Sequence, residues 1–200
     1  MSADHPDTTD LSRRIIDVAI DITLTSDWAG LTMSRLASAV GVSRQTIYNE
    51  VGSKPHLAEL IVLTEAAKFL DAVNSSFDEH EPDYESAMRQ AIRQVLQLGE
   101  HNALLRAIVG TVGTAEILGP AHGAQSALLP LLTTQSQALL AAATQVVAAR
   151  LQGCGVAPQR AEPVSEFVVR LVLSYLMQPG DSNNDRADLI VDVVAPALRA

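Results

Sequence analysis

Apolar residues recur at helical spacing along most of the 200-residue chain, and polar or glycine-containing stretches separate these runs. Side chains that return every three or four positions lie on one face of a helix, and such a face is buried when the chain folds. The pattern therefore indicates an all-α protein. It predicts helices at about residues 11–26, 33–40, 44–51, 54–74, 82–101, 104–112, 126–152, 158–177 and 185–198.

Capping residues mark the ends of the first predicted helices. Asp10, Thr32 and Ser43 each precede an apolar run, and their side chains can accept a hydrogen bond from a free N–H group in the first turn. Gly41 ends the second helix, and Pro55 suits the first turn of the fourth, where no N–H donor is needed. Three helices, two of them short, therefore precede a longer one.

Composition supports a helical, folded protein of the cytoplasm. Hydrophobic residues make up 48% of the chain and charged residues only 18%, a balance that favours a buried core over disorder. Cys154 is the single cysteine, so no intramolecular disulfide can form and a reducing compartment suffices. The acidic N-terminal stretch is unlike a secretory signal, and no run of eighteen apolar residues follows. We expect a soluble, cytoplasmic protein without membrane association.

Net charge by itself does not indicate a nucleic-acid partner. The chain carries a formal charge of −9, whereas proteins that bind phosphates usually present a basic surface. Residues 1–56 hold five Lys/Arg against seven Asp/Glu, and the remainder holds nine against sixteen. The N-terminal part is only less acidic, so a DNA-binding face would have to depend on a few well-placed cations.

The spacing of Ala37, Gly41 and Ile47 is typical of a helix-turn-helix. The small residue lies where two helices touch, glycine permits the sharp turn, and the apolar residue packs the second helix onto the first. These residues lie between two capped amphipathic segments and follow another helix. The combination predicts a DNA-binding domain in which the helix after Ser43 enters the major groove.

The stretch from Gly30 to Lys54 resembles the signature of the TetR family of transcriptional repressors, and the similarity extends over about residues 11–60. The resemblance implies an N-terminal DNA-binding domain at residues 1–55 and a helical effector-binding and dimerisation domain at residues 56–200. It also implies a homodimer that binds a palindromic operator in double-stranded DNA. The segment from Arg44 to Pro55 is also similar to an actinobacterial subgroup associated with alkane or fatty-acid metabolism.

Matching positions suggest which residues meet DNA. Arg44 and Gln45 are chemically the best base readers, because arginine pairs with guanine and glutamine with adenine through two hydrogen bonds. Lys54 matches the usual phosphate-contacting lysine, and Thr32 matches a threonine that meets a phosphate at the start of the second helix. The residues expected at DNA are Thr32, Ser43, Arg44, Gln45, Thr46, Tyr48, Asn49 and Lys54.

Several alternatives remain open in this region. Tyr48 could be an ordinary packed aromatic, and Arg44 and Lys54 could be solvated cations. Glu50 departs from the family pattern, since it places a negative charge where phosphates are expected; it either points away or reads cytosine. Val51 replaces a common phenylalanine, which should alter packing beneath the recognition helix.

The resemblance also assigns roles to the C-terminal helices. The last two usually form the dimer, although their apolar residues could instead be monomer core. The candidate interface residues are Phe167, Val168, Leu171, Val172, Tyr175, Ile190 and Val194. Between the two terminal regions, apolar side chains outnumber polar ones, so we expect a cavity for an apolar effector such as a fatty acyl compound. Its candidate lining is Ile92, Leu96, His101, Ile108, Val112, Leu129 and Leu132.

Other function classes find little support in the sequence. His101 and His122 lack a third metal ligand at a recognisable spacing, and Asp181, Asp185 and Asp188 lack the glycine and glutamate of a calcium loop. No phosphate-binding glycine loop or nucleophile elbow occurs, so we expect neither an enzyme nor a cofactor. An adaptor with a degenerate helix-turn-helix is the remaining alternative, which a loss of operator affinity together with a stable partner protein would favour.

Overall fold

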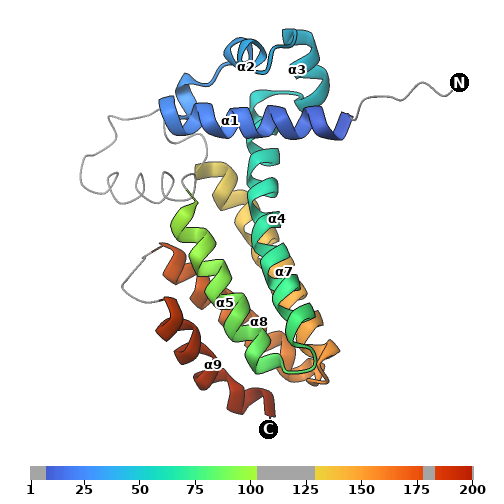
Figure 1. The fold of residues 1–200 in the computed structure, drawn as a ribbon, viewed down its shortest axis with the longest axis vertical. Helices are drawn as coiled ribbons and strands as arrows, with labels where there is room; N and C mark the ends of the chain where they lie inside the picture. Colours follow the sequence, from blue (N-terminus) through green and yellow to red (C-terminus); the bar gives the residue numbers. More distant parts are fainter. Residues whose placement is uncertain (1–7, 103–128, 178–182, 200) are drawn as a thin grey trace, which may run out of the picture. The chain divides into compact units, whose positions relative to one another are not determined.

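The computed structural model describes residues 8–102, 129–177 and 183–199, and every element in these ranges is a helix (Figure 1). The all-α prediction is confirmed, while the helix predicted at 104–112 lies outside the described residues. The helices are α1 (Thr8–Gly30), α2 (Met33–Val40), α3 (Arg44–Val51), α4 (Lys54–His80), α5 (Tyr84–His101), α7 (Leu129–Gly153), α8 (Pro158–Met177) and α9 (Asn183–Arg199).

Two helix ends differ from their predictions. Helix α1 begins at Thr8, so Asp10 lies in its first turn rather than at the cap, where its charge still favours the positive end of the helix. Helix α4 continues beyond the predicted end near Asn74 to His80. The polar stretch there does not end the helix, because Phe77 is buried and the Ser76 hydroxyl donates to the backbone of the preceding turn at 2.8 Å.

The chain divides into two compact units, and α4 passes continuously from one into the other. Of the described residues, the first unit contains α1, α2, α3, α4 up to Glu65 and the start of α7 up to Thr133. The second contains α4 from Ala66, α5, α7 from Thr134, α8 and α9. The domain boundary expected after residue 55 stays a prediction.

The core of the first unit joins α1, α2, α3 and the start of α4 around the contact between α2 and α3. Ala37 is 3% exposed and Ile47 is fully buried, so the small residue and the apolar residue of the motif meet inside this core, as predicted. The other fully buried members are Ile15, Ala19, Leu31, Leu36, Val51, Leu57 and Ala58.

The second unit is held by an apolar core and by ion pairs between helices. Its core includes Phe77, Met88, Ile92, Leu96, Leu151, Val168, Ile190 and Val194. Helices α5 and α9 lie side by side, and α8 packs against both (Figure 1). Arg89 of α5 donates to Asp188 and Asp192 of α9 at 3.1 and 2.6 Å. Hydrogen bonds to the carboxylate of Asp192 raise the pKa of Arg89.

Gly41 provides a measurable test of the turn between α2 and α3. It ends α2 in the left-handed region, with φ of 82°, and its N–H donates to Ala37 O at 2.9 Å. A Cβ added at this position would meet no atom within 4 Å, so Gly41→Ala should introduce backbone strain alone and destabilise by about 1 kcal/mol. The matched control is Gly153→Ala at the end of α7, where φ is not positive and space is also open.

Urea unfolding of the two variants measures both effects. We expect Gly153→Ala to be neutral or stabilising by up to about 1 kcal/mol, because alanine restricts the unfolded chain more than glycine does. Equal effects at the two positions would contradict the role assigned to the left-handed turn.

Candidate DNA-binding site

The two helices of the motif begin at the predicted caps. Thr32 is extended (φ −119°, ψ 150°), and its hydroxyl accepts from the Arg35 N–H at 3.1 Å. Ser43 is extended in the same way, and its hydroxyl accepts from the Thr46 N–H at 3.0 Å. Both N-cap predictions are confirmed. The caps fix where α2 and α3 start and therefore which side chains face outward.

Helix α3 buries one face and exposes a polar one. Ile47 and Val51 are fully buried, whereas Arg44, Gln45 and Asn49 are exposed. The Gln45 side-chain amide donates to Asn49 Oδ1 at 2.9 Å, so these two side chains are paired along the helix surface.

Tyr48 lies on the exposed side of α3 with 42% of its surface accessible. Tyr48 is therefore not part of the buried core of this unit. The Arg44 guanidinium carbon lies 5.9 Å from the centre of its ring, a distance at which a cation and an aromatic face attract. The contact limits the freedom of both side chains beside the Gln45–Asn49 pair.

Glu50 points toward α1. Its Oε2 accepts from the Ser12 hydroxyl at 2.8 Å, and the side chain is half-buried. Two alternatives were open for Glu50. In the structure its side chain turns away from the exposed face of α3. Val51, the other departure from the family pattern, is the last residue of α3 and is fully buried on the inner face of that helix.

Lys54 lies in an environment that the sequence did not reveal. Its ammonium donates to Trp28 O at 2.7 Å and to Leu31 O at 2.6 Å, and it lies 5.0 Å from the Trp28 ring centre. The side chain is half-buried between the end of α1 and the start of α4. The sequence predicted either a phosphate contact or a solvated cation for Lys54. Neither prediction included these intramolecular partners.

The predicted interface residues divide into two groups. Phe167 is 49% exposed, and Leu171 and Tyr175 are half-buried against the core. Ile190 and Val194 are 1% and 4% exposed, because they face the protomer's own core. For these two residues, and for the buried Val168 and Val172, the monomer-core alternative describes the structure.

Different apolar residues of α8 and α9 reach the surface. Leu173 of α8 and Leu189 and Val193 of α9 are large and exposed, with Val193 at 60%. Both neighbours, Leu189–Ile190 and Val193–Val194, are apolar, so helical spacing could not indicate which member of each pair faces inward. In α9 the exposed apolar residues therefore lie one position before the predicted interface residues Ile190 and Val194.

Few of the predicted effector residues fall in the described part of the chain. Ile92 and Leu96 of α5 are buried in the core of the second unit. The side chains of His101, Ile108, Val112, Leu129 and Leu132 lie outside the described residues. The apolar cavity stays a prediction.

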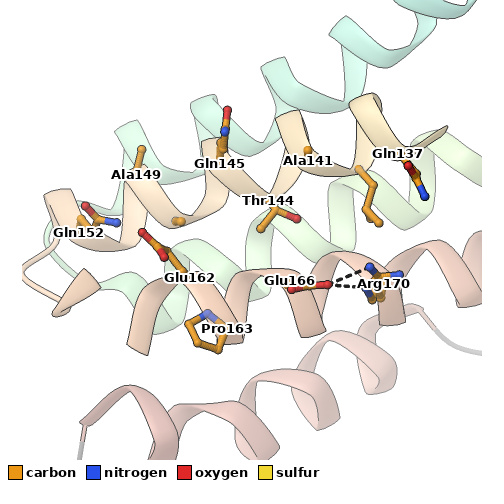
Figure 2. A pocket seen from close by; sticks show the side chains of 12 residues that line it. Gln137, Ala141, Thr144, Gln145, Ala149, Gln152, Glu162, Pro163, Glu166 and Arg170 are labelled. Carbon is orange, nitrogen blue, oxygen red and sulfur yellow. Dashed lines mark hydrogen bonds and ion pairs between the residues drawn. The ribbon is translucent and has the colours of Figure 1, made fainter. Parts of the chain in front are cut away.

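A cavity that the sequence did not predict opens between α7 and α8, with a volume of about 850 Å³ (Figure 2). Gln145 and Thr144 of α7 and Glu162 of α8 are among the polar side chains along it. Glu166 and Arg170 form an ion pair at 2.8 Å at one side. Its remaining lining is Gln137, Leu140, Ala141, Ala148, Ala149, Gln152 and Pro163. This mixed lining differs from the apolar cavity that was expected.

Among the described residues, no group of three or more His, Cys, Asp or Glu side chains could hold a metal ion. Asp188, one of the calcium candidates, accepts hydrogen bonds from Arg89 and Arg93. Burial raises the pKa of the Cys154 thiol, which keeps it protonated and weakly nucleophilic. No helix in the described ranges is long and apolar enough to cross a membrane.

A capped pair of helices at a glycine turn, packed on α1 and exposing a polar second helix, defines a helix-turn-helix DNA-binding domain. A model of the family described as bacterial tetracyclin repressor, C-terminal domain, matches residues 83–196. The HTH-type transcriptional regulator AlkX of Mycobacterium tuberculosis is 31% identical over 184 residues, which cover 91% of this chain and 82% of the relative. The chain belongs to the TetR family, a family of DNA-binding transcription regulators and not of enzymes.

Solved structures agree with this assignment. The crystal structure of the TetR family repressor AlkX from Dietzia sp. strain DQ12-45-1b, implicated in biodegradation of n-alkanes, is 26% identical with a TM-score of 0.69. The match covers 93% of this chain and 96% of that one. A TetR-family regulator from Pectobacterium atrosepticum shares the fold at 13% identity, with a TM-score of 0.62 over 98% and 96% of the two chains.

Proposed function

We propose that this chain is a repressor that binds a palindromic operator as a homodimer. The observation that carries the proposal is the exposed face of α3, where Arg44, Gln45, Tyr48 and Asn49 present donors and acceptors suited to base edges. Thr32 and Ser43 are exposed at the starts of α2 and α3, where free N–H groups favour phosphates. One such helix per protomer suits a symmetric pair of half-sites.

Base reading predicts a loss of discrimination rather than a uniform loss of affinity. Gln45→Ala or Arg44→Ala should cost roughly 1–3 kcal/mol at particular base pairs and little at others. Binding to a panel of operators with single base-pair changes measures the preference, after the operator has been selected from a randomised duplex pool. Ser38→Ala, exposed on α2, is the matched control. An Arg44→Ala profile parallel to that of the wild type across the panel would contradict its role as a reader.

The homodimer would be formed by the outward apolar residues of α8 and α9. Phe167, Leu173, Leu189 and Val193 are large and exposed on two helices that pack on each other. Large exposed apolar side chains in a soluble protein favour association. These four residues replace the buried Ile190 and Val194 as interface candidates.

The proposed effector is an apolar molecule such as a long-chain acyl compound. The interior of the second unit is rich in aliphatic side chains, and the AlkX structure from Dietzia is described as implicated in biodegradation of n-alkanes. Its candidate lining remains the set expected from the sequence, which is Ile92, Leu96, His101, Ile108, Val112, Leu129 and Leu132. Helix α4 would transmit binding, because it is continuous from the first unit, which contains the helix-turn-helix, into the second unit.

A further inference from the structure

The end of α1 and the start of α4, both in the first unit, each lack the charged residues that would stabilise a helix end. The last turn of α1 has no basic residue, although free carbonyl groups give that end a partial negative charge. Helix α4 begins with Lys54 and has no acidic residue in its first turn, although that end carries a partial positive charge. A lysine at this position should disfavour α4 unless another partner compensates.

The compensating partner is the end of α1. The Lys54 ammonium donates to Trp28 O at 2.7 Å and to Leu31 O at 2.6 Å. It also lies 5.0 Å from the centre of the Trp28 ring, which adds a favourable contact between the cation and the aromatic face. Hydrogen bonds with an ionised donor are about twice as strong as neutral ones. One side chain therefore neutralises the negative end of α1 and ties it to α4.

The Trp28 carbonyl lies in the last turn of α1, and the Leu31 carbonyl lies in the connection that leads directly into Thr32. Leu31 is fully buried, its N–H donates to Trp28 O at 3.3 Å, and Thr32 follows it as the N-cap of α2. Arg35 secures the same connection from the other side, since its guanidinium donates to Ser26 Oγ at 2.6 Å and to Gly30 O at 3.2 Å. The position of Thr32 thus depends on backbone groups that Lys54 holds.

From these contacts we infer that Lys54 is a positioning residue for DNA binding. It fixes the connection between α1 and α2 so that the Thr32 hydroxyl and the N–H groups at the start of α2 are held ready for a phosphate. The inference rests on the proposed operator binding, and it assigns Lys54 a role through Thr32 in place of the direct phosphate contact expected from its sequence position.

The Lys54→Met variant tests the inference, because methionine keeps an apolar stem and removes the ammonium. In the free protein, amide hydrogen exchange across residues 28–35 should become faster. Affinity for the selected duplex should fall about tenfold, the loss expected for a charge-assisted hydrogen bond. The slope of log affinity against log salt should stay unchanged, since a phosphate-contacting cation would lower it by about one. Arg44→Met should leave the exchange of residues 28–35 unchanged.

A double-mutant cycle separates positioning from mere stabilisation. Thr32→Ala should weaken DNA binding less in the Lys54→Met background than in the wild type, because both changes disturb the same contact. A salt slope lowered by about one with unchanged exchange would overturn the inference in favour of a direct phosphate contact. A lower melting temperature with unchanged affinity would also overturn it. If the wild-type protein selects no duplex at all, the proposed function itself fails. The lowered salt slope and the lowered melting temperature would each contradict the role of Lys54 but leave the proposed function intact.

Discussion

Val193→Asp is expected to convert the proposed dimer into a monomer and to weaken binding to a palindromic operator roughly 100-fold or more. Val193 is 60% exposed in the protomer, so the substitution should leave the protomer's fold intact. In a dimer formed by α8 and α9, the new carboxylate would be buried against apolar residues of the partner without a cation to pair with, which is strongly unfavourable. Two linked recognition helices gain roughly 10² to 10⁴ in affinity over one, and that gain would be lost.

Sedimentation equilibrium measures the oligomeric state, and titration of full and half operators measures the affinity. Ser75→Asp on α4 adds the same charge at another exposed position and should change neither. The half-operator affinity of Val193→Asp should remain close to that of the wild type, because α3 is unaltered. A Val193→Asp protein that stays dimeric at micromolar concentration would contradict the assigned interface.

An acyl effector that releases the operator 100-fold should itself bind the operator complex 100-fold more weakly than the free protein. The two factors are equal because coupling between binding sites is reciprocal, and 100-fold corresponds to about 2.7 kcal/mol. Calorimetric titration of a homologous series of acyl compounds into free protein and into the operator complex measures both affinities. Each methylene removed should cost about 0.8 kcal/mol if the chain is buried in an apolar site. Equal affinities in the two titrations would rule out this switch.

The cavity of mixed lining between α7 and α8 provides the control for this experiment. Glu166→Gln removes a charge from its lining and breaks the ion pair with Arg170. Acyl affinity should be unchanged in this variant, because the proposed effector site is apolar. A large change in acyl affinity would indicate that the effector binds in the cavity between α7 and α8 instead.

The DNA-binding unit could be predicted closely because its signals are local. Thr32 and Ser43 cap helices within three residues of themselves, and Gly41 occupies a left-handed turn that other residues adopt with difficulty. The core positions Ala37 and Ile47 follow from the same short stretch. Such features depend on neighbouring residues and hardly on the rest of the chain.

The features that escaped prediction depend on residues far apart in the sequence. Lys54 bonds to carbonyls more than twenty positions earlier, and Glu50 bonds to Ser12 of α1. Backbone carbonyls carry no sequence signal, so a lysine that binds them looks like any exposed cation. The cavity between α7 and α8 arises from how two helices pack, which periodicity within either helix does not specify.

The ion pairs between α5 and α9 support the orientation in which α9 packs on α5. Hydrophobic burial sets the same orientation, because Ile190, Val191, Val194 and Leu198 form the buried face of this helix. Asp188 and Asp192 are one turn apart, and both are bonded to Arg89, which holds the helix at a single rotational setting. That setting turns Val193 outward. In the proposed dimer, quaternary structure would thus depend partly on charges within one subunit, and exchanging Arg89 with its carboxylate partners would test this without altering the apolar residues of the interface.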